Sequence, residues 1–387
     1  MLHHKLKKKY SLCSYCLYRQ LTGVGNTNNR LHKKGRLSSN SDSCYICQGI
    51  MDQLDWIVKK ICDLVEEKKY QFDSFLLGAT LPSLVFERED SIRARFKLRG
   101  RENIKKQFVD ELRKKFEYLT GKSLEHIIPD ITINIVIDSQ EENNNDDASS
   151  SPTISVKSSP LFLAGRYVKT QRGLSQKKDK CQKCLGSGCA LCRYLGTSSF
   201  NNIESIIASR ILEITEGENP KFSWLGGEDK DSLVLGKGRP FLLRVSNPKI
   251  RSLKADLTIK ENGVYAVIKQ QKPHLSSKLP SHFITKTKIT IQTEQDLCSK
   301  SLARLLNILE NSEVTFKAKS KIVKKKIYSL RVEQIDERKF VLTIVADGGL
   351  LIKQFVGGQK YIEPNISKII GMECECIAFD ILEVNTQ

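Results

Sequence analysis

The chain has 387 residues, and 63 lysines and arginines against 44 acidic residues give it a net charge of +19. This length is enough for two or three domains, and the excess of cations is typical of proteins that bind a polyanion such as nucleic acid. The absence of an apolar run of about 18 residues excludes a membrane-spanning helix. Because no secretory signal is recognisable at the start, we expect a cytoplasmic protein whose 12 cysteines are metal ligands or buried thiols rather than disulfides.

Residues 1–50 are polar and contain two Cys-x-x-Cys pairs, which predict a zinc-binding segment. Each pair can direct two sulfurs at one ion, and two pairs complete a tetrahedral site. The alternative is a set of unrelated thiols. The proposed ligands are Cys13, Cys16, Cys44 and Cys47.

Residues 51–175 mix helical and strand patterns. Apolar residues recur every three or four positions from Asp52 and again over Glu102–Leu119, which predicts two helices, the second with five cations on its other face. Alternation over Ser91–Leu98 predicts a strand with arginines and lysines along one face. Residues 138–152 are acidic and rich in Asn and Ser, so we expect a disordered loop at the tip of a hairpin. Further strands are predicted at Phe75–Gly78, Ile131–Ile137 and Thr153–Val156, and Leu161–Thr170 is expected to be a strand or a loop.

A second set of four cysteines lies within twelve residues, at Cys181, Cys184, Cys189 and Cys192. This glycine-rich stretch has almost no apolar core, so a bound metal would supply its folding energy. Independent or redox-linked thiols are the alternative. Both sets contain only sulfur ligands, which favours structural rather than catalytic zinc. We place a domain boundary just after this second set.

From Ile203 to the end the pattern is α+β. A short helix is expected at Ile203–Ile211 and another at Leu302–Leu309. The predicted strands are Phe241–Val245, Leu257–Ile259, Val264–Ile268, Lys288–Ile291, Tyr328–Val332, Phe340–Val345 and Leu350–Val356.

The segment Trp224–Phe241 is a glycine-flanked acidic turn with a basic exit, WLGGEDKDSLVLGKGRPF. Its spacing alone favours a solvated loop whose acids offset nearby lysines. The segment nevertheless resembles a motif of the archaeal and eukaryotic, THUMP-containing family of pseudouridine synthases that act on uridines 54 and 55 in the T-loop of tRNA. The matching residues are Gly226, Glu228, Asp229, Asp231, Leu235, Gly236, Gly238, Arg239, Pro240 and Phe241.

Other motifs extend the resemblance over most of the chain and in the same order. They are FLLGATLP at residues 75–82, PLFLAGRYVKTQRG at 160–173, GGLLIKQFV at 348–356 and EPNISKIIG at 363–371. The resemblance implies an α+β protein with an N-terminal zinc knuckle and THUMP-like RNA-binding half, and a C-terminal mixed-sheet catalytic domain. The expected divisions are 1–50 (zinc-binding), 51–175 (THUMP-like), 176–200 (four-cysteine knuckle) and 201–387 (catalytic).

What the resemblance implies chemically is an isomerisation of uridine to pseudouridine without a catalytic cofactor. Asp229 would be the nucleophile, and Lys353 the cation that keeps its carboxylate ionised. The target base would have to leave the RNA stack. The partner would be tRNA, through its T-loop and acceptor region, and we expect a monomer.

Several positions depart from the family pattern. Gly227 and Leu233 replace two arginines of the motif. Two tyrosines that hold the target base align with Lys288 and Leu351, which together with Arg239 form the expected substrate-binding set, and Tyr265 is an alternative to the first. A catalytically degenerate tRNA-binding protein is therefore the alternative function. Basic residues at 93–99, on the helix 102–119 and at 324–326 are the expected RNA contacts, although each alone is typical of a solvated face.

Overall fold

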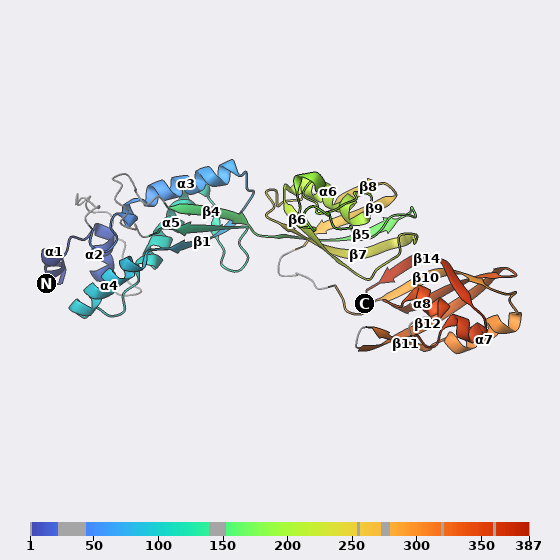
Figure 1. The fold of residues 1–387 in the computed structure, drawn as a ribbon. Helices are drawn as coiled ribbons and strands as arrows, with labels where there is room; N and C mark the ends of the chain where they lie inside the picture. Colours follow the sequence, from blue (N-terminus) through green and yellow to red (C-terminus); the bar gives the residue numbers. More distant parts are fainter. Residues whose placement is uncertain are drawn as a thin grey trace. The chain divides into compact units, whose positions relative to one another are not determined.

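The computed structural model describes residues 2–21, 44–138, 152–253, 256–271, 279–318, 321–358 and 361–386. The loop expected at 138–152 therefore lies, apart from its two ends, outside the described residues. The chain divides into two compact units, Met1–Ser159 and Pro160–Gln387 (Figure 1). Among the described residues, no helix is long and apolar enough to cross a membrane.

The first unit is built on a four-stranded sheet with the order β2-β1-β3-β4. Strand β1 is parallel to β2 and β3, whereas β4 is antiparallel to β3 and completes the predicted hairpin. Helices α3 and α5 pack against each other and against the sheet (Figure 1), because their apolar faces bury residues such as Phe108 and Phe116. The bounds are α3 Leu54–Glu67, β1 Ser74–Thr80, α5 Ile104–Thr120, β2 Ser123–Leu124, β3 Ile131–Val136 and β4 Thr153–Ser158.

Three further helices, α1 (Leu2–Lys9), α2 (Ser14–Leu21) and α4 (Ser83–Phe96), complete this unit. The strand predicted at Ser91–Leu98 is wrong, because this segment is the end of α4. Val85, Glu89 and Ile92 are buried at helical spacing, whereas Arg93 is half-buried and Arg95 is exposed. The sequence pattern missed the helix because a charged residue, Glu89, occupies its buried face.

Glu89 joins three helices through a buried network. Its Oε1 accepts from Arg19 Nε at 2.5 Å and from Gln20 Nε2 at 2.9 Å, both on α2, and its Oε2 accepts from the backbone N–H of Ile104, the first residue of α5, at 3.0 Å. Arg93 adds a second cation 3.2 Å away. Since both Arg19 and Glu89 are almost fully buried, this carboxylate fixes the helix that carries Cys16 to the rest of the unit.

The second unit is one ten-stranded sheet with the order β11-β12-β13-β10-β14-β7-β5-β9-β8, and β6 pairs with β7 outside this path. Its bounds are β5 Leu161–Lys169, α6 Ile203–Thr215, β6 Glu218–Trp224, β7 Val234–Ser246, β8 Leu257–Glu261, β9 Val264–Gln270, β10 Ile284–Thr293, α7 Ser299–Leu309, β11 Glu313–Ala318, β12 Lys321–Asp336, β13 Lys339–Asp347, α8 Ile352–Gly357, α9 Ile366–Ile370 and β14 Cys374–Asn385.

The boundary between the units differs from the expected divisions at 175 and 200. Strand β5 pairs with β7 and β9, so the chain already belongs to the large sheet from Leu161 onward. The segment with Cys181–Cys192 is likewise part of the second unit. The cysteine spacing indicated only the local knuckle. The boundary between the units instead lies before β5, because β5 pairs with strands of the second unit.

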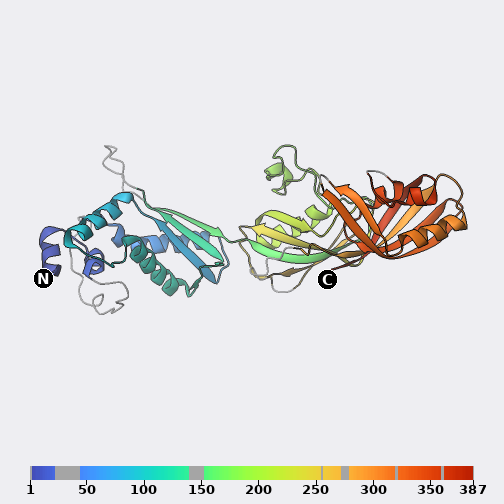
Figure 2. The same ribbon diagram turned by 90° about the horizontal axis from the view of Figure 1, so that it is seen from below.

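The large sheet has two apolar cores, which meet at its centre. One lies around β5, β7, β9 and α6, and the other lies under α7, α8 and α9 beside β10 and β13 (Figure 2). They join where β14 runs parallel to β7, with Ile381 paired to Val234. The turn that leads into β7 therefore opens at the junction of the two halves.

We expect Glu89→Ala to destabilise the first unit by about 3–5 kcal/mol, because two guanidinium groups would be left without their acid, one of them deeply buried. Hydrogen exchange at the amides of α4 and α5 would measure the loss. Glu102→Ala, which removes only the exposed pair with Lys106, is the control and should cost less than about 0.5 kcal/mol. Equal protection in the two variants would contradict the structural role of Glu89.

Candidate active site

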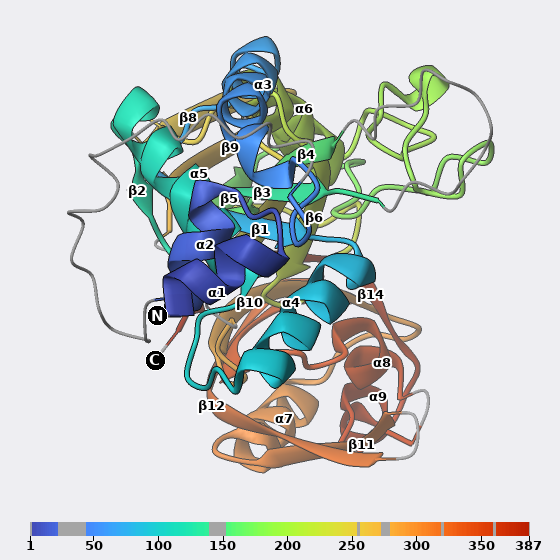
Figure 3. The ribbon, with the colours of Figure 1, turned by 90° about the vertical axis from the view of Figure 1, so that its left-hand side faces the viewer.

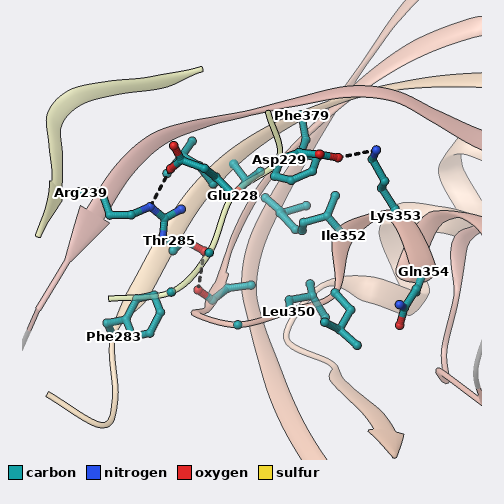
Figure 4. A pocket seen from close by; sticks show the side chains of 18 residues that line it. Glu228, Asp229, Arg239, Phe283, Thr285, Leu350, Ile352, Lys353, Gln354 and Phe379 are labelled. Atoms are coloured by element: carbon teal, nitrogen blue, oxygen red, sulfur yellow. Dashed lines mark hydrogen bonds and ion pairs between the residues drawn. The ribbon is translucent and has the colours of Figure 1, made fainter. Parts of the chain in front are cut away.

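A pocket of about 390 Å³ opens at the junction of the two halves of the large sheet (Figure 4). Its walls come from the turn between β6 and β7, from β7, β10, β13 and β14, and from the start of α8. The side chains labelled in Figure 4 are Glu228, Asp229, Arg239, Phe283, Thr285, Leu350, Ile352, Lys353, Gln354 and Phe379.

Gly226 gives the acidic turn its shape. It has a φ of +79°, and a Cβ there would lie 2.6 Å from Arg239 Nη1 and 3.0 Å from the ring of Phe283. Only glycine accommodates both the left-handed backbone and this close approach. The turn consequently passes directly over Arg239, with Glu228 and Asp229 following.

Glu228 is fully buried and is held by three side chains. Its Oε2 accepts from Arg239 Nε at 3.0 Å and from the Tyr167 hydroxyl at 2.7 Å, and Lys169 Nζ lies 3.5 Å from its Oε1. Gln176 donates to the Tyr167 oxygen at 2.9 Å and thereby fixes the hydroxyl as a donor to Glu228. Burial and the nearby Glu228 charge raise the pKa of Tyr167, so the hydroxyl keeps its proton.

Lys169 holds the backbone of the turn. Its ammonium is fully buried and donates to the carbonyls of Leu174 at 3.0 Å, Asp229 at 2.9 Å and Lys230 at 3.2 Å. Burial lowers the pKa of this lysine, and the carboxylate of Glu228 opposes that effect. The two peptide groups that follow Asp229, one on each side of Lys230, are thus fixed by a charge that Glu228 keeps in place.

Arg239, expected to bind substrate, does lie on the pocket wall, but its guanidinium is used internally. Besides Glu228 it donates through Nη1 to the carbonyl of Leu225 at 2.7 Å, and only 1% of the residue is exposed. Its observed contacts therefore support the turn.

Asp229 and Lys353 form an ion pair across the pocket (Figure 4). The second carboxylate oxygen of Asp229 accepts from the backbone N–H of Lys230 at 3.0 Å. The hydrogen bond and charge of Lys353 lower the pKa of Asp229, and the same contact raises the pKa of Lys353. Both groups are therefore charged at neutral pH, and the side chain of Asp229 remains 32% exposed toward the pocket.

Lys353 reaches Asp229 from a helix, not from the strand predicted at Leu350–Val356. Ile352, Phe355 and Val356 are buried at helical spacing, which forms the short helix α8. Leu351 precedes this helix and lines the pocket, as expected for a substrate-binding position.

Lys288 does not lie in the pocket. Thr285 and Thr287 line it from β10, and because side chains alternate along a strand, Lys288 projects to the opposite, exposed face. Tyr265 is not among the lining residues either, since β5, β7 and β14 separate its strand β9 from β10 in the sheet. The structure thus brings together Asp229, Lys353, Leu351 and Arg239 of the predicted site, and leaves Lys288 out.

Two aromatic rings of the pocket, Phe283 and Phe379, escaped the sequence reasoning. Phe283 is clamped between glycines, because a Cβ at Gly348 would come within 2.0 Å of its ring. Phe379 lies on β14, which pairs with β10. Both rings could have been placed beside the acidic turn only from the pairing of β10 with β14, which no sequence motif specifies.

The turn is also fastened to β14 by Arg172, which the sequence analysis did not single out. Its two terminal nitrogens bond the carboxylate of Asp380 at 2.7 and 2.9 Å, and Asp380 accepts from the backbone N–H of Leu233 at 2.9 Å. Leu233 stands where the family motif has an arginine. In this chain the backbone of Leu233 is instead held by Asp380, which lies outside the motif and is bound by Arg172.

The two sets of four cysteines are each gathered with their sulfur atoms within 4.8 Å of one another. The Sγ atoms of Cys13 and Cys47 are 3.6 Å apart, and those of Cys184 and Cys192 are 3.7 Å apart. Four sulfurs at about 2.3 Å from a tetrahedral zinc ion would be separated by about 3.8 Å, so both sets are compatible with zinc knuckles.

Backbone N–H groups support the thiolate form of Cys192 in the second set. Cys192 accepts from the N–H of Cys189 at 3.1 Å and from that of Gly196 at 3.2 Å. Burial alone would raise the pKa of the Cys192 thiol, but these donors outweigh it and lower the pKa to about 6. Thiolate is the form that binds zinc.

Comparisons with known proteins identify the family of both units. Residues 57–138 match the family model described as the archaeal Pus10 THUMP domain, and residues 162–385 match that of the Pus10 C-terminal region. The chain is 33% identical over 390 residues to a tRNA pseudouridine synthase Pus10 of Nitrosopumilus maritimus, covering 99% of this chain and 97% of the relative. The corresponding protein of Cenarchaeum symbiosum is 29% identical over 98% of this chain and 91% of its own length.

The first unit therefore contains a THUMP domain, and the second is the C-terminal domain that accompanies it in one family of RNA-modification proteins. The chain belongs to the Pus10 family.

We expect Lys353→Gln to raise the pKa of Asp229 toward the ordinary value of an aspartate, because the variant removes the main group that lowers it. An NMR titration of the Asp229 carboxyl carbon would measure the change. Lys288→Gln is the control, since this exposed lysine lies on the far face of β10 and should leave the pKa of Asp229 unaltered. The same titration curve in Lys353→Gln as in the parent chain would refute the pairing.

Proposed function

We propose that this protein isomerises uridine to pseudouridine in tRNA, at position 54, position 55 or both. The observation that carries the proposal is the Asp229–Lys353 ion pair inside a pocket of nucleotide size, on a chain whose relatives are named tRNA pseudouridine synthases. A pocket of a few hundred Å³ encloses one base and its sugar but not a base pair. The target uridine must therefore leave the RNA stack before it reacts.

In the proposed reaction, the carboxylate of Asp229 is the nucleophile that attacks the flipped nucleotide. The carboxylate bonds to C1′ as the N1–C1′ glycosidic bond breaks, and the base then turns within the pocket. C5 forms the new bond to C1′ as the bond between C1′ and the carboxylate breaks. The proton on C5 is then released and N1 gains one, so that product and substrate have the same composition. No catalytic cofactor enters this scheme, and the charge of Lys353 keeps Asp229 ionised as the nucleophile requires.

The remaining walls suit a base that must turn without leaving. Phe283, Phe379 and Ile344 present apolar surface, and the hydroxyl groups of Thr285 and Thr287 are the neutral polar groups on the β10 side. Hydrocarbon walls hold the flat faces of a base without fixing its polar edge. That combination permits rotation between the cleavage and the formation of the glycosidic bonds.

The basic surfaces of the two units are the proposed contacts with the tRNA backbone. On α5, however, three of the five cations pair with acids, namely Lys106 with Glu102, Lys114 with Glu111 and Lys115 with Asp55. In the second unit the exposed Lys326 on β12 has no acid within ion-pair distance among the described residues, and Lys324 pairs with Glu313 at 3.3 Å. We therefore place more of the phosphate binding on β12 than the sequence alone suggested.

Asp229→Asn should abolish pseudouridine formation, because an amide cannot act as the nucleophile, while the affinity for tRNA stays within about twofold. Chemical mapping of pseudouridine on an unmodified tRNA transcript would measure the first effect, and filter binding the second. Asp256→Asn, an exposed acid paired with Lys269 at the edge of the sheet, is the control that should keep full activity. Full activity of Asp229→Asn would overturn the assignment of the nucleophile.

A tRNA-binding protein without catalytic activity is the second candidate, and one observation favours it. None of the described residues that line the pocket is a tyrosine. The mapping assay with the parent chain decides between the two functions. Tight binding of tRNA without product, even at stoichiometric protein, would establish the binding protein.

We further propose that each set of four cysteines holds one structural zinc ion. The sulfur separations and the N–H donors around Cys192 support this assignment. Cys13, Cys16, Cys44 and Cys47 would anchor α2 and the turn after residue 44 in the first unit, and Cys181, Cys184, Cys189 and Cys192 would close the knuckle of the second.

Metal analysis should then find two zinc ions per chain, falling to one in Cys184→Ser. A strong chelator should lower the melting temperature of the parent chain, because the binding energy of the metal is part of the folding energy. Cys298→Ser, an exposed thiol outside both sets, is the control. Absence of zinc from the purified protein would refute this proposal and leave the catalytic one intact.

A further inference from the structure

The knuckle of residues 177–200 displays large apolar side chains at its surface. Figures 2 and 3 show the segment, in light green, standing out from the body of the second unit. Four of its side chains are exposed, Leu185 by 77%, Leu191 by 70%, Tyr194 by 67% and Phe200 by 40%. Side chains so exposed contribute little to folding, so their presence calls for a role at the surface.

The backbone of the knuckle holds Tyr194 in this exposed position. Arg193 and Tyr194 both have positive φ, 49° and 61°, which is uncommon for bulky residues and costs conformational energy. Gly188 permits it, because a Cβ there would lie 2.9 Å from the carbonyl oxygen of Tyr194. The result is a tyrosine ring fixed on the outside of a small, rigid knuckle.

The charge of the same segment is strongly positive. Between residues 177 and 193 there are five lysines and arginines and a single acid, Asp179. One of these cations, Lys178, pairs with Glu204. The others, which have no acid within ion-pair distance among the described residues, are Lys177, Lys180, Lys183 and Arg193.

A groove of about 700 Å³ separates the knuckle from β6, and Tyr194 lies on its wall. The opposite wall carries Lys221, which is exposed, and Phe222, whose ring stacks on Trp224 with centroids 4.8 Å apart. The groove therefore combines an accessible aromatic face with a lysine that makes no ion pair among the described residues. Lys178 of the knuckle also lines the groove, where it pairs with Glu204.

We infer that this groove binds unpaired nucleotides of the RNA substrate, with a base stacked on Tyr194 and phosphates at Lys221 and the knuckle cations. Aromatic faces bind bases that are already unstacked, and clustered lysines bind the phosphates that join them. A duplex would therefore contact the lysines through its phosphates but could not stack a base on Tyr194. The charge favours a polyanion over an apolar protein partner. The inference rests on the proposed function, since it takes the RNA to be the substrate tRNA.

The test is the affinity of the full-length chain for an unmodified tRNA transcript, measured by fluorescence anisotropy. Tyr194→Ala should weaken binding about 5- to 150-fold, the range that loss of one base–aromatic stack produces, and Tyr194→Trp should restore it to within about twofold. Lys221→Gln should weaken binding less and reduce the slope of log Kd against log salt by roughly 0.7. A short single-stranded RNA should compete at this site, and a duplex RNA of equal length should not.

Tyr361→Ala is the matched control, because Tyr361 is 90% exposed and also has a positive φ of 54°. Metal content equal to that of the parent chain would show that the Tyr194 variants keep an intact knuckle. At saturating tRNA, Tyr194→Ala should form pseudouridine at the parental kcat, with only KM raised.

Equal affinity of Tyr194→Ala and Tyr361→Ala for tRNA would overturn the inference. Failure of the proposed function has a different signature, since the parent chain itself would then form no pseudouridine, whether or not its affinity for tRNA depended on Tyr194. A fall in kcat with KM unchanged would also overturn the inference, because the groove would then act on the chemistry rather than on binding.

Discussion

The second unit depends on one buried carboxylate, that of Glu228. Burying a charge is unfavourable unless cations and hydrogen-bond donors surround it, and Glu228 is enclosed by Arg239, Lys169 and the hydroxyl of Tyr167. These groups come from adjacent antiparallel strands, where Tyr167 is paired with Arg239. Because Lys169 also bonds the carbonyl of Asp229, the charge balance of Glu228 determines the backbone of the next residue. Glu228 therefore has the structural role, and its neighbour Asp229 has the proposed catalytic role.

The position of the pocket follows from the way in which the two halves of the sheet are joined. The half around β5 and β7 supplies the acidic turn, whereas the half around β10, β13 and α8 supplies Lys353 and most of the walls. At the junction, Asp380 on β14 bonds both Arg172 and the backbone of Leu233. The Asp229–Lys353 pair thus spans the junction, and the distance between its two charged groups depends on how the two halves of the sheet are aligned.

The sequence predicted those features whose signal is local. Helical spacing located α3 and α5, cysteine spacing located both sets of sulfurs, and the ordered motifs brought Asp229 and Lys353 to one site. It failed where tertiary contacts decide. The charged residue Glu89 lies on the buried face of α4, so the sequence lacks a continuous apolar pattern there. The alignment placed Lys288 in the pocket, but Lys288 faces outward and its neighbour Thr287 faces the pocket. In a strand an error of one position reverses the face, so a motif without its strand partners cannot fix which side chain enters a pocket.

Other side chains of the pocket can replace part of what the two family tyrosines, which align with Lys288 and Leu351, would provide. A tyrosine offers a ring that holds the base and a hydroxyl that can hydrogen-bond or move a proton. The rings of Phe283 and Phe379 provide the first property, and the hydroxyls of Thr285 and Thr287 on β10 supply only weakly acidic donors in place of the second. In the proposed reaction these rings would hold the base, whereas transfer of the C5 proton would require another group or water. Among the described residues that line the pocket, Asp229 is the carboxylate that is both ionised and exposed. In the proposed reaction it is therefore the base best placed for that transfer, once its bond to C1′ has been released.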